Sequence, residues 1–266
     1  MSILSEIIAN KQKEVLAAQE RYPLKLLEES EHYKVKSVSL KSYLLRKDKA
    51  GIIAEIKRKS PSKGVLNAHI SVEELSSAYM QAGASALSVL SDKDYFGGSN
   101  EDVKIARRFN FCPILRKDFI IDEYQVHETK AIGADCMLLI AAALTKDKVK
   151  NLSKLAHDLG LETLLEIHSL EELTDSSLDH IDLIGVNNRD LKTFSVSIET
   201  SLELVKHIPK DKIAISESGI TRAEEIIVLK KAGFSGFLMG EAFMSQINPA
   251  KACSRLVQEV KKLILE

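Results

Sequence analysis

The first residues that suggest chemistry are Glu55 and Lys57, two ionisable side chains inside an apolar stretch. They alternate with three apolar positions, Ile52, Ala54 and Ile56. Residues two apart in a strand share one face, so a strand over 51–57 would hold the carboxylate and the ammonium together. Such a pair can donate and accept protons when it is positioned against a substrate. The stretch therefore predicts a buried strand whose end enters a catalytic site.

The same spacing recurs at the ends of other apolar runs. Lys117, Glu166 and Glu217 each stand two residues after an apolar residue, which is Leu115, Leu164 or Ile215. An asparagine and an arginine, Asn187 and Arg189, are two apart in GVNNRDL. Any one of these residues could be an ordinary charged strand end that meets solvent. Together they would bring ionisable groups close enough to shift one another's pKa values, which is typical of functional sites.

The elements that must position these groups follow a regular rhythm after residue 50. Eight apolar runs predict strands at 51–57, 84–90, 112–117, 134–140, 162–167, 183–186, 213–216 and 234–239. Charged stretches of helical character lie between them, including 72–82, 123–132, 146–159, 222–231 and a last helix over 249–265. This alternation is typical of an α/β protein of the (β/α)8 TIM-barrel type, whose active sites lie at the C-terminal ends of the strands. A doubly wound open sheet is the competing architecture, but no GxGxxG follows the first strand.

The chain is interpreted as one barrel domain over 1–266, with an N-terminal helical extension at 1–49 and the barrel at 50–266. Apolar residues near helical spacing predict a first helix before Arg21-Tyr22-Pro23, where the proline breaks it. A short second helix is expected through Leu26 and Leu27, and 32–49 is interpreted as a connector.

The composition excludes several classes of protein. The 266 residues include 37 Lys+Arg and 38 Asp+Glu, a formal net charge of -1, so no surface for nucleic acid or for an anionic membrane is expected. No apolar segment is long enough to predict a membrane span or a secretory leader. The three cysteines are far apart and form neither a metal motif nor a disulfide framework. We expect a cytoplasmic protein without a metal or a cofactor.

Glycines after the last two predicted strands indicate an anion site. Ser218 and Gly219 precede a helix start, and Gly240 follows the eighth strand. Late loops of TIM barrels often bind phosphate through backbone amides and a helix N-terminus, and glycine allows a close approach. Ser60, in the turn 60–64, could add a hydroxyl. A phosphorylated small molecule is therefore the expected ligand, although a glycine after a strand can also serve only as a turn.

The motifs resemble those of one family, indole-3-glycerol-phosphate synthase of tryptophan biosynthesis. Eight segments carry the resemblance: AEIKRKSPSKG (54–64), DYFGGS (94–99), LRKDFIID (115–122), DCMLLIAAAL (135–144), LLEIH (164–168), IGVNNRDLKTF (184–194), ISESGI (215–220) and FLMGEAFM (237–244). They occur in the family's order, and the helical extension fits as well. The resemblance implies a carbon–carbon lyase that closes the pyrrole ring of 1-(2-carboxyphenylamino)-1-deoxyribulose 5-phosphate. The reaction then releases CO₂ and water, and it needs no cofactor.

The resemblance also implies a role for each clustered residue. Lys117 would be the principal general acid at the ketone oxygen, and Glu166 would be the base. Lys57 would hold the substrate carboxylate and serve as the acid in dehydration, although the order of the two lysines is left open, and Glu55 would orient them. The implied substrate-binding residues are Asn187 and Glu217 for the hydroxyls and the anilino nitrogen, Arg189 for the carboxylate network, Ser218, Gly219, Gly240 and Ser60 for the phosphate, and Phe96, Phe119, Leu138 and Pro61 for the benzene ring.

Some residues in these motifs are not expected in the site. Arg58 and Lys59 are interpreted as solvated charges, and His168 is expected to point away from Glu166 on a loop. Plain core packing is an equally good interpretation of Phe119 and Leu138.

Three alternative functions remain open. One is an aldolase-like barrel in which Lys117 forms a Schiff base. Another is a non-catalytic phosphate-ligand binder on the same fold, which would have little use for a base. A third is phosphoribosylanthranilate isomerase, whose chemistry would need a Cys/Asp pair at the C-terminal mouth of the barrel. Cys112 lies instead at the N-terminal end of its predicted strand. We expect a monomer, and docking with other enzymes of the tryptophan pathway is left open.

Overall fold

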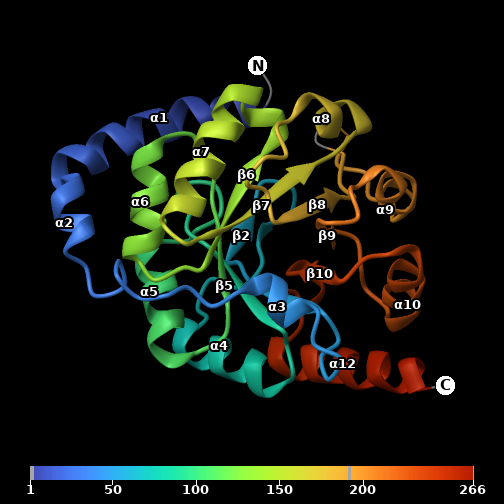
Figure 1. Ribbon diagram of the computed structural model, residues 1–266. Helices are drawn as coiled ribbons and strands as arrows, with labels where there is room; N and C mark the ends of the chain where they lie inside the picture. The colour runs from blue at the N-terminus through green and yellow to red at the C-terminus, as the bar shows by residue number, and fades with distance from the viewer. Residues whose placement is uncertain (1–2, 191–192, 266) are drawn as a thin grey trace.

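A computed structural model describes residues 3–190 and 193–265 of the chain. Eight parallel strands close into a barrel with helices outside it, which confirms the predicted TIM-barrel fold (Figure 1). The barrel strands are β1 (Ile52–Ile56), β4 (Ala86–Leu90), β5 (Ile114–Lys117), β6 (Cys136–Ile140), β7 (Glu162–Ile167), β8 (Leu183–Asn187), β9 (Ile213–Glu217) and β10 (Gly236–Met239). Each strand pairs with its neighbours in chain order, and β1 closes the ring by pairing with both β4 and β10.

The strand bounds differ from the predicted ones mainly at the N-terminal ends. The third strand begins at Ile114 rather than at residue 112, because Pro113 has no N–H to give to a ladder. Two strands extend one residue further than predicted, to Asn187 and Glu217. Both extensions lie at the C-terminal mouth, so two candidate site residues are held by the barrel ladder itself.

Helices surround the barrel and separate successive strands. They are α4 (Val72–Gln81), α5 (Asn100–Phe109), α6 (Glu123–Ala131), α7 (Lys146–Asp158), α8 (Leu170–Asp175), α9 (Glu199–Leu204), α10 (Ala223–Ala232), α11 (Glu241–Met244) and α12 (Pro249–Leu265), with short 3-10 turns η1 (Ala141–Ala143) and η2 (Val205–His207). Side-chain oxygens of Ser71, Ser99, Thr145 and Ser169 accept the first free backbone N–H groups of their helices. None of the helices in the described ranges combines the length and the apolar character that crossing a bilayer requires.

The apolar side chains form two clusters. The larger one lies between the strands and the outer helices. The smaller one fills the barrel interior and includes Ile53, Leu115, Leu164, Ile215 and Leu238. These residues precede Glu55, Lys117, Glu166, Glu217 and Gly240 by two positions, so alternation places those five at the mouth, above the apolar interior.

A short helix closes the other end of the barrel. The segment interpreted as a connector contains α3 (Leu40–Leu44), whose Leu40 and Leu44 belong to the interior cluster. Glu162, the first residue of β7, accepts hydrogen bonds from the Ser39 hydroxyl and from the Lys41 backbone N–H at 3.0 Å. The N-terminal end of the barrel is therefore plugged with apolar side chains, which leaves the C-terminal end for chemistry.

The first helices lie against loops at the C-terminal end. They are α1 (Ile3–Arg21), drawn in blue in Figure 1, and α2 (Leu24–Glu28). Asn10 donates to Asp94 at 2.9 Å, and Gln19 donates to Asp122 at 3.2 Å. Both aspartates belong to loops that follow barrel strands, so α1 braces the rim of the mouth.

The turn after the first strand is part of a hairpin. Residues 59–65 form a small antiparallel hairpin of β2 (Lys59–Ser60) and β3 (Gly64–Val65). The interpretation of Arg58 as a solvated charge is wrong. Its guanidinium forms a two-point ion pair with Asp102 at 2.6 and 2.9 Å, and it donates to the Gly97 carbonyl at 3.1 Å. Arg58 therefore ties the base of the hairpin to the following loop and to α5.

Candidate active site

A buried ammonium lies at the centre of the mouth. Lys117 ends β5, and its Nζ lies 2.7 Å from Oε2 of Glu166 on β7 and 2.5 Å from Oε2 of Glu217 on β9. The carboxyl groups come from strands that flank β8, where alternation aims both of them inward. Two carboxylates that share one ammonium form a charge-assisted network well suited to proton transfer.

Burial and mutual charge set the proton affinities of this cluster. Burial opposes the charged form of Lys117, but the charges of Glu166, Glu217 and Glu55 outweigh it and raise the pKa of Lys117. Burial raises the pKa of Glu217 to about 7, and the nearby Glu166 charge adds to the effect although Lys117 opposes it. The pKa of Glu166 is lowered, because the attraction of Lys117 exceeds the cost of burial. Of the two carboxyl groups, Glu217 therefore takes up a proton first.

A second carboxylate and a second lysine lie close together, Glu55 on β1 and Lys57 just after it. Lys57 Nζ is 2.6 Å from Oε1 of Glu55, and both side chains are largely withdrawn from solvent. Glu55 also contributes to the electrostatic field at Lys117. The structure thus brings together all four residues that were predicted to be catalytic: Glu55, Lys57, Lys117 and Glu166.

Two glycines make room for the carboxylates. A Cβ at Gly185 would overlap Oε1 of Glu217, and a Cβ at Gly240 would overlap Oε1 of Glu55. Gly185 lies on β8 between the two glutamate-bearing strands, and Gly240 follows β10 directly. A side chain at either position would displace the neighbouring carboxylate from the place it holds here, so both glycines leave room for the cluster.

Asn187 at the end of β8 and Arg189 just after it connect the cluster to the start of α11. Asn187 donates to Oε1 of Glu166 at 3.1 Å, and its own Oδ1 accepts the Arg189 backbone N–H at 3.0 Å. The Arg189 guanidinium contacts Glu241 at 3.0 Å, and Glu241 also lies 3.5 Å from Lys63 at the hairpin tip. Glu241 was not predicted. Its two cations come from loops far apart in sequence, which no local pattern could bring together.

The loop after β9 has an unusual backbone. Ser218 and Gly219 both have positive φ, at 68° and 75°. Buried Asn188 holds this turn, because its Nδ2 donates to the Ser218 carbonyl and to the Ser216 hydroxyl, both at 3.0 Å. Its Oδ1 accepts the Ser201 backbone N–H at 3.1 Å and the Ser201 hydroxyl at 2.8 Å. Sequence reasoning missed Asn188, although it directly follows the predicted Asn187.

The predicted aromatic residues are neighbours. The rings of Phe96 and Phe119 are tilted by 40°, with centroids 6.0 Å apart. Phe119 also packs against the interior cluster, to which Leu138 belongs with 2% of its surface exposed. Pro61 is exposed at the hairpin tip, and in the same hairpin Ser60 Oγ accepts the Lys63 backbone N–H at 3.3 Å. A ring slot at Phe96 and Phe119 and a phosphate contact at Ser60 stay predictions.

Known proteins are similar in sequence to this chain along almost its whole length. A profile described as indole-3-glycerol phosphate synthase matches residues 4–256. An indole-3-glycerol phosphate synthase from Bacteroides thetaiotaomicron is 47% identical over 259 residues, which cover 97% of this chain and 99% of that protein. One from Chromobacterium violaceum is 43% identical over 257 residues, covering 96% and 97%.

The chain belongs to the indole-3-glycerol phosphate synthase family. The resemblance carried by the eight sequence motifs is thereby confirmed. Among solved structures, the tryptophan synthase α2β2 complex from Pyrococcus furiosus contains a similar chain, with a TM-score of 0.59 at 16% identity, over 81% of this chain and 99% of that one. At that identity the likeness shows a shared fold and nothing more.

One histidine of this synthase-family barrel lies where it was not expected. His168 is two residues beyond Glu166 and therefore shares its face, so the prediction that it points away is wrong. Its Nε2 lies 3.6 Å from Oε1 of Glu166, its Nδ1 lies 3.3 Å from Glu172, and only 11% of its side chain is exposed. Burial opposes protonation, but Glu172 and Glu166 together raise the pKa of His168. It is thus a second basic neighbour, beside Lys117, for the Glu166 carboxyl group.

Proposed function

We propose that the mouth of this barrel converts 1-(2-carboxyphenylamino)-1-deoxyribulose 5-phosphate into indole-3-glycerol phosphate by general acid–base catalysis. The single observation that carries the proposal is the Lys117 ammonium, buried between the Glu166 and Glu217 carboxyl groups. Family membership supplies the reaction, and this cluster supplies groups of the kind that the reaction needs. The enzyme is a decarboxylating carbon–carbon lyase.

Lys117 acts at the ring closure. As the aryl carbon attacks the ketone carbon, the ketone oxygen gains negative charge and takes a proton. An ammonium stabilises such a developing alkoxide and can donate that proton. Lys117 already donates to two carboxyl groups, and an ammonium has three N–H donors, so one remains for the substrate oxygen. The carbon–carbon bond to the carboxylate then breaks and releases CO₂.

Dehydration uses the second acid and the base. The hydroxyl group leaves as water with a proton from Lys57, and Glu166 removes a proton from the new ring. The Glu166 carboxylate is ionised before it accepts a proton, because the charge of Lys117 outweighs the cost of burial and lowers its pKa. Glu55 holds Lys57 at 2.6 Å, where the ammonium keeps two further donors for the substrate carboxylate.

The remaining residues bind the substrate. Asn187 and Glu217 contact the hydroxyl groups and the anilino nitrogen, and Arg189 supports the carboxylate network. The phosphate binds near Ser60, the 218–219 turn and Gly240. Buried Asn188 holds this turn by donating a hydrogen bond to the Ser218 carbonyl. Phe96 and Phe119 hold the benzene ring, with Leu138 and Pro61 at the edge of the slot.

The Schiff-base alternative is disfavoured by the same cluster. A lysine that attacks a carbonyl must be neutral, and enzymes lower its pKa to obtain that form. The carboxyl groups around Lys117 raise its pKa instead. This environment supports an acid and opposes a nucleophile.

We also propose that the enzyme works as a monomer in the cytoplasm. Three free, buried cysteines support a reducing compartment. Size-exclusion chromatography with light scattering at micromolar concentration tests the monomer, and a mass near twice 29.5 kDa would contradict it.

The activity is tested by mixing the purified chain with the carboxyphenylamino-deoxyribulose phosphate and following indole fluorescence. The chain contains no tryptophan, so the protein adds almost no background to this signal. We expect turnover at nanomolar enzyme without added metal or cofactor. No fluorescence gain at micromolar enzyme, with folded protein confirmed by circular dichroism, would refute the proposed function.

A further inference from the structure

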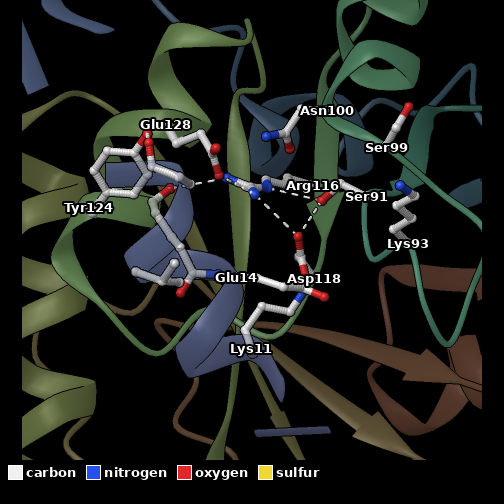
Figure 2. A pocket seen from close by; sticks show the side chains of 13 residues that line it. Lys11, Glu14, Ser91, Lys93, Ser99, Asn100, Arg116, Asp118, Tyr124 and Glu128 are labelled. Atoms are coloured by element: carbon white, nitrogen blue, oxygen red, sulfur yellow. Dashed lines mark hydrogen bonds and ion pairs between the residues drawn. The ribbon is translucent and has the colours of Figure 1, made fainter. Parts of the chain in front are cut away.

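Lys11 is a buried lysine that does not belong to the Lys117 cluster. It lies in the middle of α1, with 4% of its surface exposed, beside a cavity of about 240 Å³ between α1 and the outer wall of the barrel. Figure 2 shows it below Asp118 and Arg116, which also line this cavity. Burial of an ammonium is unfavourable unless carboxylates surround it. A lysine here calls for an explanation beyond the packing of an amphipathic helix.

Three carboxylates surround the ammonium. Lys11 Nζ lies 2.9 Å from Oδ2 of Asp92, 2.9 Å from Oδ1 of Asp118 and 2.6 Å from Oε2 of Glu14. Glu14 is on the same helix, whereas the two aspartates belong to different loops of the barrel mouth. Asp92 follows β4, and Asp118 follows β5. One side chain of the N-terminal extension thus joins two neighbouring loops.

Each aspartate fixes the backbone of an aromatic residue. Oδ1 of Asp92 accepts the backbone N–H of Tyr95 at 2.8 Å and that of Phe96 at 3.2 Å. Oδ1 of Asp118 accepts the backbone N–H of Phe119 at 2.8 Å. Phe96 and Phe119 are the pair whose rings lie 6.0 Å apart. Their spacing therefore depends on how the two aspartates are placed relative to each other.

The two aspartates differ in their other partners. Asp118 also contacts Arg116 at 3.1 Å and accepts the Ser91 hydroxyl at 2.6 Å. Among the described residues, Lys11 is the one cation that contacts the Asp92 carboxylate. Removal of the Lys11 ammonium would therefore leave the Asp92 carboxylate without its cation, while Asp118 keeps Arg116. The barrel itself would stay intact, because neither loop belongs to its strands.

We propose that Lys11 is a positioning residue for the aromatic slot. By binding Asp92 and Asp118 together, it holds Phe96 and Phe119 at the spacing that grips the carboxyphenyl ring and aims its reacting carbon at the ketone. This inference rests on the proposed function, since it assigns the ring of that substrate to this slot. It gives the N-terminal extension a part in turnover although the extension supplies no catalytic group.

The test compares Lys11→Met with Lys13→Met in the full-length chain. Both remove an ammonium from α1, but Lys13 is exposed and serves as the matched control. With the fluorescence assay, we expect Lys11→Met to raise KM and to lower kcat, with a 10- to 100-fold loss in kcat/KM, because a small misplacement of reacting groups has effects of that size. Lys13→Met should stay within twofold of the unmodified chain. Both variants are assayed well below their unfolding temperatures.

A double-mutant cycle with Phe119→Leu separates positioning from general loosening. If Lys11 acts through the aromatic pair, the fold loss in kcat/KM that Lys11→Met causes should be at least five times smaller in the Phe119→Leu background than in the unmodified chain. Losses that multiply independently would overturn the inference, and so would a folded Lys11→Met chain with unchanged kcat and KM.

A second variant keeps the test decisive if Lys11→Met does not fold. Asp92→Asn keeps an oxygen for the Tyr95 and Phe96 N–H groups but removes the charge that Lys11 binds. We expect it to lower kcat/KM at least fivefold and to show the same coupling to Phe119, and unchanged values would count against the inference. Activity of the unmodified chain is measured first, so a failure of the proposed function is distinguished from a failure of the Lys11 role.

Discussion

Replacement of Lys117 by methionine tests the centre of the proposed mechanism. Methionine has a similar length and fills the same space, but it has no proton to donate and no charge. The change removes two ion pairs, at 2.7 Å to Glu166 and 2.5 Å to Glu217. A positioned general acid contributes about 10²- to 10⁴-fold in rate, and stabilisation of a developing oxyanion adds about 10²- to 10³-fold. We therefore expect kcat to fall by at least about 10⁴-fold, which corresponds to about 5.5 kcal/mol in the barrier.

The stability of Lys117→Met should depend on pH in a direction that the structure fixes. Without the ammonium, the Glu166 and Glu217 carboxyl groups face each other in a buried site, so burial and repulsion raise their pKa values. A carboxyl group whose pKa is higher in the folded than in the unfolded state makes the folded state less stable as the pH rises from the unfolded pKa through the folded pKa. Relative to the unmodified chain, the variant should thus lose more unfolding free energy at pH 8 than at pH 6. Urea titrations at the two pH values measure the difference.

Lys130→Met is the matched control for this experiment. Lys130 is also a buried lysine, but its ammonium donates to the Val35 carbonyl at 2.8 Å and to the Ser37 hydroxyl at 3.0 Å, away from the mouth. We expect it to lower stability while kcat, from the fluorescence assay with saturating substrate, stays within about twofold. A folded Lys117→Met chain that keeps more than a tenth of kcat would refute the acid role of Lys117.

Three further changes probe the surroundings of the acid. Glu217→Gln removes a carboxyl group whose pKa is raised to about 7. As the pH rises from 5 to 8, the unfolding free energy of the variant in urea should therefore increase by up to about 3 kcal/mol relative to that of the unmodified chain. A difference that does not change with pH would contradict this prediction. In the same variant, the change in kcat/KM that titration of Glu217 causes near pH 7 should disappear from the pH profile. A change near pH 7 that persists would come from another group, such as the substrate phosphate. Gly240→Ala places a Cβ against the Glu55 carboxylate and should lower kcat/KM by about 10- to 100-fold, and wild-type kinetics would show that Glu55 can move without consequence. Asn188→Ala leaves the Ser201 N–H and the Ser218 carbonyl without their side-chain partner. It should lower the unfolding free energy by about 2 kcal/mol and raise KM. An unchanged KM would show that the 218–219 turn has no part in substrate binding.

The sequence predicted what depends on strand alternation. Placing Glu55, Lys117, Glu166 and Glu217 on inward faces at one end of eight strands needs only the period of two and the closure of the barrel. The structure then shows Lys117 bound to two carboxyl groups that are 49 and 100 residues away in sequence. This convergence could be predicted because parallel strands carry their C-terminal ends to one rim.

Contacts made by loops could not be predicted in the same way. Glu241 of α11 meets Lys63 and Arg189, and Arg58 meets Asp102 of α5, but no periodicity sets the distance from such loop residues to these helices. Burial of Lys11 was missed for a related reason. Charged residues on an amphipathic helix normally face water, and only the positions of the two aspartates reveal that this one does not. The error at His168 was different, because the alternation rule was available and places it beside Glu166.

The carboxyl groups around Lys117 raise a question about its strength as an acid. Two carboxylates make Lys117 a weak acid, whereas a general acid works best with a pKa near the working pH. Protonation of Glu217 resolves the conflict in part, since it leaves Lys117 with a single ionised partner and makes the ammonium more acidic. Substrate binding acts in the same direction when an anilino or hydroxyl group takes a hydrogen bond that Lys117 held. We therefore propose that the raised pKa of Glu217 lets one cluster both bind an ammonium tightly and release its proton during turnover.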